Sequence, residues 1–375
     1  MKFTIKREIL LEALNKVSKA ISTKNLIPVL AGIKFELKKK KLILTASDND
    51  ITIQTTIESI KEEEFKIENE GSIVITGKYI LDIVRKLPDE YINIEVIDDL
   101  KILIYTENSE FNLNGISESE YPNIGLEESK KKIDIKSSIL KSIVVQTAFA
   151  SSNEESKPVL TGINFNIVGD ILECNSTDSY RLARKVVKLN KVSDENYNIV
   201  IPSRNLIEFT RILDGEMEDV ELHIFNNKIL FKTGNLKFES RLINGTYPNT
   251  SNLLPEDSLV IVSTSLSDFY NVIDRVSILT SDKEKNIVTL ETEGNTLILK
   301  SSSVEIGRVE EKMIIKKNND ENIKISFSAK YMMEALKSFS TESVDIHFVG
   351  EIKPILIKSK EDETLTQLVL PIRTY

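Results

Sequence analysis

The chain has 375 residues, which at roughly 150 residues per domain predicts two or three domains, each with its own core. Hydrophobic residues make up 41% of the chain and charged residues 29%, a balance that excludes a disordered or fibrous protein. The formal net charge of −9 argues against a protein that holds nucleic acid over its whole surface.

The rarest residues narrow the classes of chemistry. The sequence has one cysteine, Cys174, and two histidines, His223 and His347, both in alternating strand-like segments. A disulfide framework and a multi-cysteine metal site are therefore excluded, and hydrolases built on a Ser–His or Cys–His pair have little to work with. We predict no metal and no cofactor.

No apolar run approaches the length of a bilayer-spanning helix, and the first ten residues, MKFTIKREIL, lack the apolar stretch of a signal peptide. We expect a cytoplasmic protein that does not contact a membrane. The nearest approach to a phosphate-binding loop is the segment from Gly71 to Lys78, which has five residues between its glycines instead of four. Because Tyr79 stands where a magnesium-binding Ser or Thr is needed, we do not interpret this segment as a nucleotide site.

In chain order, the predicted elements follow one pattern three times: helix, hairpin, helix, hairpin, with further strands between. The first helices begin near Ile9, Ile139 and Phe269, and the second span residues 76–88, 202–215 and 328–340. The first hairpins turn at 38–40, 168–170 and 293–295, and the second near 98–99, 226–227 and 349–350.

The second helices share a gapless pattern. Lys78, Arg204 and Lys330 occupy the same place in each and are separated by 126 residues in both steps. Offsets of 2, 3, 5 and 9 residues from these positions are apolar in every copy, and they fall at about 200°, 300°, 140° and 180° around a helix. The apolar set is Ile80, Leu81, Ile83 and Leu87; Leu206, Ile207, Phe209 and Leu213; Met332, Met333, Ala335 and Phe339.

The opposite face of these helices is charged in the order basic, acidic, basic. The three sets are Lys78-Asp82-Arg85, Arg204-Glu208-Arg211 and Lys330-Glu334-Lys337. One such set is most simply a solvated face with weak ion pairs, but three in register indicate a duplicated unit. Each face is mildly positive within a negative protein.

A second group of motifs supports the duplication. Pro28-Val29-Leu30 recurs as Pro158-Val159-Leu160, and Tyr121-Pro122 recurs as Tyr247-Pro248. Strand alternation implies that one sheet face is buried, and the helices are what can bury it. We predict an α+β protein of three repeated domains, each an antiparallel sheet with two helices, at 1–125, 126–253 and 254–375.

Three copies of this unit in one acidic chain resemble the bacterial sliding clamp family, the β subunit of DNA polymerase III. The most specific signatures are NSTDSYRL at residues 175–182, the GTYP turn at 245–248 and the LPIR segment at 370–373. The resemblance implies the ring-forming DNA clamp fold: a homodimer, without catalytic activity, that encircles double-stranded DNA. It also implies that DNA polymerase and clamp-loader subunits bind the ring through short linear peptides.

By position in the family, three sets of residues carry these functions. The peptide site comprises Leu160, Thr177, Ser179, Tyr180, Arg181, Leu182, Pro248, Leu253, Pro354, Leu368, Val369, Leu370, Pro371, Ile372 and Arg373. The DNA-facing residues are Lys24, Lys78, Arg85, Arg204, Arg211, Lys330 and Lys337. The dimer interface joins Phe111 and Leu113 to Ile278 and Leu279 of the partner.

Two other classes of protein compete with this interpretation. One is an enzyme with an unrecognised site, which needs a cleft with convergent ionisable groups. The other is a scaffold that forms no ring and binds only proteins. We also expect Pro371 to place the C-terminal segment at a sheet edge, because proline cannot donate a ladder hydrogen bond.

Overall fold

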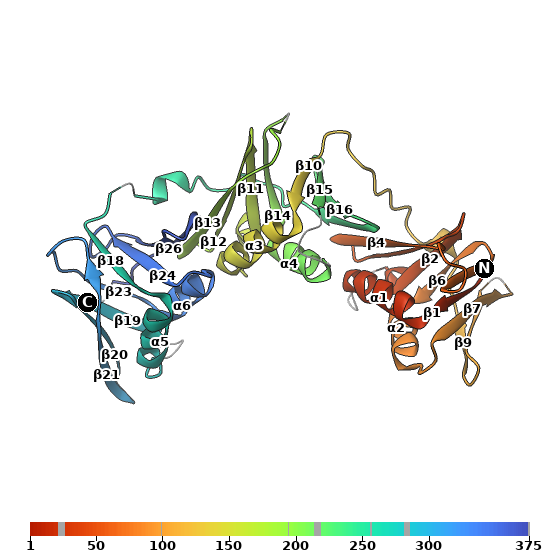
Figure 1. Ribbon diagram of the computed structural model, residues 1–375, viewed down its shortest axis with the longest axis horizontal. Helices are drawn as coiled ribbons and strands as arrows, with labels where there is room; N and C mark the ends of the chain where they lie inside the picture. The colour runs from red at the N-terminus through yellow and green to blue at the C-terminus, as the bar shows by residue number, and fades with distance from the viewer. Residues whose placement is uncertain are drawn as a thin grey trace. The chain divides into compact units, whose positions relative to one another are not determined.

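The computed structural model describes residues 1–21, 27–98, 100–193, 195–213, 219–255, 257–280 and 286–373. The chain forms two compact units. Figure 1 labels helices and strands of both. The first unit is Met1–Ser138 with Glu208–Leu242, and the second is Ile139–Ile207 with the chain from Ile243 onward. Among the described residues, no helix is both long and apolar enough to cross a bilayer.

The first unit contains two antiparallel sheets. The five-stranded sheet has the order β5 (Phe65–Asn69), β1 (Lys2–Lys6), β7 (Tyr91–Ile97), β8 (Lys101–Tyr105), β9 (Glu110–Asn114). The eight-stranded sheet has the order β10 (Ile133–Lys136), β15 (Asp219–Ile224), β16 (Lys228–Thr233), β17 (Leu236–Arg241), β4 (Ile51–Glu58), β3 (Lys41–Ser47), β2 (Gly32–Lys38), β6 (Gly71–Thr76). Pairing of β17 with β4 joins strands of two sequence repeats.

The second unit repeats this plan. Its nine-stranded sheet has the order β14 (Tyr197–Pro202), β11 (Gly162–Val168), β12 (Ile171–Thr177), β13 (Arg181–Lys188), β26 (Asp362–Val369), β25 (Ile355–Ser359), β24 (Ser343–Phe348), β18 (Val260–Ser265), β22 (Lys316–Lys317). Its four-stranded sheet has the order β21 (Gly307–Ile314), β20 (Thr296–Ser303), β19 (Ile287–Glu293), β23 (Lys324–Ser328). Here β13 pairs with β26, again across two repeats.

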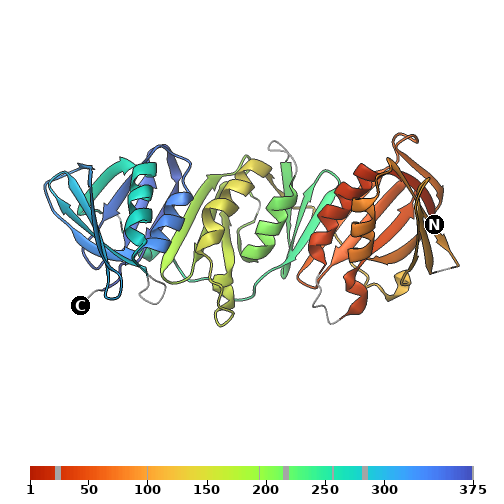
Figure 2. The ribbon, with the colours of Figure 1, turned by 90° about the horizontal axis from the view of Figure 1, so that it is seen from below.

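The helices occur two to a repeat and lie on the sheets. The six helices of the described chain are α1 (Arg7–Val17), α2 (Gly77–Lys86), α3 (Ser137–Thr147), α4 (Ser203–Ile212), α5 (Leu266–Ser277) and α6 (Ala329–Lys337). Short 3-10 helices are η1 (Ser18–Ala20), η2 (Pro28–Ala31), η3 (Glu118–Glu120), η4 (Ala148–Ala150), η5 (Pro158–Thr161) and η6 (Ser251–Leu253). Figure 2 shows α1 beside α2 and α5 beside α6, each pair packed side by side.

The predicted apolar faces hold these helices in place. Ile80, Leu206 and Met332, at the same offset in the three copies, are each fully buried. Lys78, Arg204 and Lys330 are exposed. Burying an aliphatic side chain contributes about 1.5–3 kcal/mol, so the repeated offset is enough to orient each helix. The predicted helices are confirmed, although each ends two to three residues earlier than the sequence pattern indicated.

The first hairpin turns lie where the sequence predicted them, and the segment from Gly71 to Lys78 does not form a phosphate-binding loop. The first hairpins turn at 38–41, 168–171 and 293–296, with Gly169 and Gly294 at positive φ, where a side chain is strained. The glycine-containing segment proves to be strand β6 followed directly by α2, which leaves no loop to hold a phosphate.

One expectation about the C-terminus is wrong. β26 lies between β13 and β25 in the middle of its sheet, so the segment before Pro371 is not a sheet edge. Pro371 is tolerated because β26 ends at Val369, before the proline would have to donate to the ladder.

Candidate functional site

The candidate site starts from the turn that joins β12 to β13. The side-chain oxygen Oδ1 of Asp178 accepts hydrogen bonds from the backbone N–H groups of Tyr180 (2.9 Å) and Arg181 (3.1 Å). Thr177 Oγ1 donates to the carbonyl of Arg181, and Ser179 adopts φ +79°. This turn leaves the Tyr180 ring 60% exposed and directs Arg181 inward.

Arg181 is almost fully buried, and its guanidinium group donates hydrogen bonds to residues of the second unit itself. Its Nε donates to Asp178 Oδ2 (3.0 Å), one terminal nitrogen donates to the carboxylate of Glu334, and the other donates to the carbonyl of Phe149 (2.6 Å). Its guanidinium also lies over the ring of Tyr331, 4.6 Å from the centroid. Arg181 therefore organises the wall of the site rather than offering free donors to a ligand.

The two tyrosines form an aromatic wall. The rings of Tyr180 and Tyr331 stack with centroids 6.2 Å apart and planes inclined by 22°. Burial raises the pKa of the Tyr331 hydroxyl, so this ring stays neutral at physiological pH. Beside it lies a cavity of about 660 Å³. Its lining comprises Tyr180, Asn286, Ser328, Lys330, Tyr331, Leu370, Pro371, Ile372 and Arg373.

The C-terminal segment lines one part of the cavity and is held by backbone hydrogen bonds. Leu370 N–H donates to the carbonyl of Tyr180 (2.9 Å), and Ile372 N–H donates to the carbonyl of Ser326 (2.7 Å). Next to it, Leu182, Leu356 and Leu368 form a buried aliphatic cluster. The partly buried side chains packed against that cluster are Leu254 and Leu370. An apolar floor beside an aromatic wall suits a linear peptide with aliphatic or aromatic anchors.

The structure brings seven of the fifteen predicted peptide residues to the cavity and the aliphatic cluster beside it. Tyr180 and Leu370 to Arg373 line the cavity, and Leu182 and Leu368 form the adjacent apolar cluster. Leu160 packs in a small cluster with Val200 and Tyr247, beside exposed Pro248. Val369 is fully buried in the hydrophobic core of the second unit, so its side chain is not open to a ligand.

Sequence reasoning missed three lining residues, Asn286, Ser328 and Tyr331, and it assigned Lys330 to another function. A signal was available for Tyr331. It follows the repeated basic residue of its helix and is partly buried, and its counterpart Tyr79 in α2 is an exposed aromatic residue, 56% accessible. An aromatic ring on the polar face of an amphipathic helix often marks a binding surface.

Comparison with known proteins places the chain in a family. Residues 1–125, 134–249 and 251–373 match the N-terminal, central and C-terminal domains of the DNA polymerase III beta subunit. The chain belongs to this family. It is 40% identical to the beta sliding clamps of Staphylococcus epidermidis over 378 residues and Staphylococcus aureus over 377 residues, covering all of both chains.

Solved structures agree over the whole length. The DNA polymerase sliding clamp from Bacillus subtilis superposes with a TM-score of 0.96 at 38% identity, and the beta subunit from Streptococcus pyogenes with 0.95 at 31%. Both comparisons cover 100% of each chain. The fold is therefore the three-repeat DNA clamp fold, and the family is non-catalytic.

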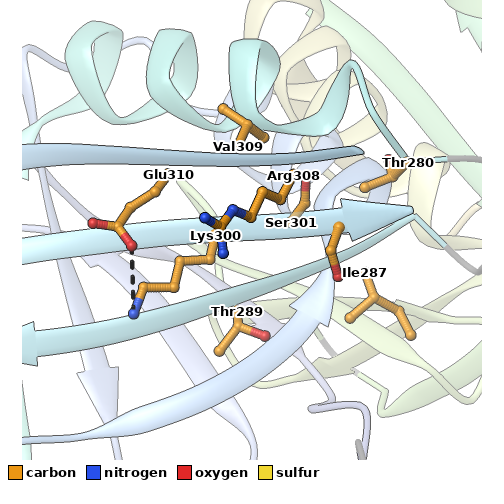
Figure 3. Close-up of a pocket in the computed structure, with 9 residues that line it drawn as sticks. Thr280, Ile287, Thr289, Lys300, Ser301, Arg308, Val309 and Glu310 are labelled. Atoms are coloured by element: carbon orange, nitrogen blue, oxygen red, sulfur yellow. Dashed lines mark ion pairs between the residues drawn. The ribbon is translucent and has the colours of Figure 1, made fainter. Parts of the chain in front are cut away.

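Two sheet edges of this clamp-family chain are open. β9 ends the five-stranded sheet and carries Phe111, 37% exposed, and half-buried Leu113. β21 ends the four-stranded sheet; on the neighbouring helix α5, the C-cap Ile278 is 72% exposed. A cavity of about 840 Å³ lies against β21 (Figure 3), with an ion pair between Lys300 and Glu310 at 3.7 Å.

The basic residues predicted to face DNA are mostly exposed, and acidic neighbours pair with some of them. Arg85 pairs with Asp82 at 3.5 Å, and Arg211 donates to Glu208, as the repeated charge pattern indicated. In the third copy the acid Glu334 pairs with Arg181 instead. Lys337 lies over the Tyr270 ring at 5.3 Å, and this contact raises the pKa of its ammonium group. Lys330 lines the cavity beside Tyr331, and Lys24 lies outside the described residues.

Among the described residues, Glu128, Glu221 and His223 are grouped closely enough to hold a metal ion. Lysine side chains already neutralise both carboxylates: Lys232 and Lys237 bind Glu128 at 2.7 and 2.8 Å, and Lys132 binds Glu221. These contacts lower the pKa of Glu128 to about 2. The donor set fits an ion-pair network, and a divalent cation would have to displace three ammonium groups.

Proposed function

We propose that this protein is a DNA sliding clamp: a non-catalytic, homodimeric ring around duplex DNA that tethers the replicative polymerase and makes synthesis processive. The observation that carries the proposal is the end-to-end match of all three repeats to the beta subunit family. We assign the domains to 1–125, 126–253 and 254–375, and the protein to the cytoplasm.

The two open edges support closure of the ring. An unpaired edge strand exposes a row of backbone donors and acceptors that favours pairing with another chain. If β9 of one protomer pairs with β21 of its partner, two identical contacts form by two-fold symmetry and both of these edge strands become paired. Phe111 and Leu113 then cover Ile278 and Leu279, which accounts for the exposure of Ile278.

The charge pattern supports a loose hold on DNA. A closed ring cannot leave an unbroken duplex, so it needs only weak, sequence-independent attraction to phosphates. Lys78, Arg204 and Lys337, exposed on three helices, supply that attraction, and neighbouring acids limit it. A chain with net charge −9 is suited to sliding rather than tight electrostatic binding.

The cavity between Tyr180, Tyr331 and the C-terminal segment supports docking of partners. It combines an aromatic wall, an aliphatic floor and two basic side chains, Lys330 and Arg373. We assign it to short linear peptides of the DNA polymerase and of clamp-loader subunits, anchored by aliphatic or aromatic side chains.

Measurement of mass in solution, together with low-resolution electron microscopy, tests the proposal against its competitors. We expect a dimer of about twice 42.5 kDa with a central hole. A compact monomer with a substrate-dependent activity would favour an enzyme. A monomer or open dimer that binds only proteins would favour a scaffold without a ring.

A further inference from the structure

The first unit contains a second copy of the turn that builds the peptide site. Here Asp48 Oδ1 accepts from the N–H groups of Asp50 (3.0 Å) and Ile51 (2.9 Å). Ser47 Oγ donates to the carbonyl of Ile51 (3.1 Å), and Asn49 adopts φ +79°. Each of these hydrogen bonds has an equivalent within residues 177–181 of the second unit. The third residue of each turn, Asn49 or Ser179, also has the same φ.

The strand that crosses this turn is also repeated. Arg241 N–H donates to the carbonyl of Asp50 at 2.9 Å, as Leu370 N–H does to that of Tyr180 at 2.9 Å. The registers of β17 on β4 and of β26 on β13 then fix which positions correspond. The corresponding pairs are Asp50 and Tyr180, Thr52 and Leu182, Glu239 and Leu368, Arg241 and Leu370, Lys228 and Pro354.

The two turns share a backbone conformation, but the side chains around them are polar in the first unit and largely apolar in the second. The first-unit positions line a small cavity of about 280 Å³, together with Leu30 and Pro122, which repeat Leu160 and Pro248. Where the second unit has an aliphatic floor, this cavity has Thr52, Glu239 and Arg241. Glu239 is partly buried and pairs with Lys228 at 2.8 Å.

We propose that Asp50, Thr52, Glu239 and Arg241 are specificity determinants that exclude the apolar peptide from the first-unit site, so that each chain binds one peptide. This inference rests on the proposed peptide-binding function of the second unit. An aliphatic anchor placed on the first-unit site would strip water from the Glu239–Lys228 ion pair and from Arg241 without offering these charges a hydrogen bond. Such a mismatch excludes a ligand from a cavity whose backbone would otherwise accept it.

A graft tests the inference. The variant Asp50→Tyr/Thr52→Leu/Glu239→Leu/Arg241→Leu gives the first-unit site the second unit's side chains at four of the five corresponding positions and keeps Lys228. The readout is the number of peptides bound per chain, measured by calorimetry with a polymerase-derived clamp-binding peptide. We expect one peptide for the unmodified chain and two for the graft. The grafted site should bind at least about 100-fold more tightly than the unmodified first-unit site.

A second substitution separates the two sites. Leu368 corresponds to Glu239, so Leu368→Glu gives the second-unit site an acid at the position where the first-unit site has one. We expect no peptide for Leu368→Glu alone and one for the graft that also carries Leu368→Glu. A folded graft that still binds one peptide, and none with Leu368→Glu added, would overturn the inference. An unmodified chain that binds no peptide would instead overturn the proposed function.

Folding of the graft is checked by circular dichroism and by retention of the second-unit peptide. If the fourfold variant does not fold, Thr52→Leu/Glu239→Leu alone replaces it, with a second site expected roughly tenfold weaker than the native one. A folded double variant without a second site would contradict the inference in the same way.

Discussion

The Arg181 guanidinium donates to the Glu334 carboxylate while lying 4.6 Å from the centroid of the Tyr331 ring. The pair joins the turn after β12 to helix α6, two segments more than 150 residues apart in sequence. The pair therefore connects the fold of the second unit to the shape of the cavity that we assign to peptides. Removing one partner should affect binding more than the fold.

For this pair we predict that Glu334→Gln weakens the polymerase-derived peptide by about three- to tenfold. The Glu334 side chain is 34% exposed, so its charged hydrogen bond contributes only about 1 kcal/mol after solvent screening. Fluorescence anisotropy gives the affinity, and circular dichroism checks the fold. Glu363→Gln, a change at an exposed position, is the control. Equal affinity in Glu334→Gln and the control would mean that the pair does not shape the cavity.

The dimer interface is tested by Ile278→Ala/Leu279→Asp. A carboxylate placed in an apolar contact costs several kcal/mol unless it is paired, which is enough to open a marginal interface. Sedimentation should report a folded monomer. The control is Ile352→Ala, which also truncates an exposed isoleucine, 60% accessible. An unchanged dimer in the double variant would show that the interface lies elsewhere.

The C-terminal segment should serve binding more than folding. Leu370→Ala/Ile372→Ala keeps both backbone hydrogen bonds but removes two aliphatic side chains from the cavity. Each side chain contributes about 1.5–3 kcal/mol when a ligand buries it fully. Losing half of their combined contribution, about 1.5–3 kcal/mol, lowers the affinity tenfold or more. We expect an intact dimer with weak peptide binding in anisotropy. Full peptide affinity in this double variant would show that the C-terminal segment is not part of the peptide site.

The ion-pair network around Glu128 predicts a pH-dependent contribution to stability. Because Lys232 and Lys237 hold the pKa of Glu128 near 2, below its ordinary 4.5, its contribution is present above pH 4.5 and is lost as the pH falls towards 2. Glu128→Gln should lower the free energy of unfolding by about 0.5–1 kcal/mol at pH 7, because the carboxylate is largely exposed.

Urea unfolding of both proteins measures this difference, which should disappear near pH 2. Glu127→Gln changes a neighbouring exposed acid and should leave the free energy of unfolding unchanged at both pH values. A deficit for Glu128→Gln that persists undiminished at pH 2 would contradict the assignment to its ionised form.

The helices were predictable because their apolar offsets repeat: Ile80, Leu206 and Met332 are buried as the pattern required. The hairpins were predictable from their turn residues. Pairing between repeats was not, because alternation within β17 or β26 says nothing about which distant strand lies beside it. The internal partners of Arg181 were missed for the same reason, since Glu334 approaches it only through the fold.

The threaded ring is tested most directly by loading the protein onto nicked circular DNA and then linearising the circle. We predict that the protein stays on the circle through gel filtration and is lost once a restriction enzyme opens it, since only topology holds it. Binding to short linear duplex should be weak and steeply salt-dependent. Retention on the linearised DNA, or tight binding to short duplex at high salt, would contradict the sliding-clamp account.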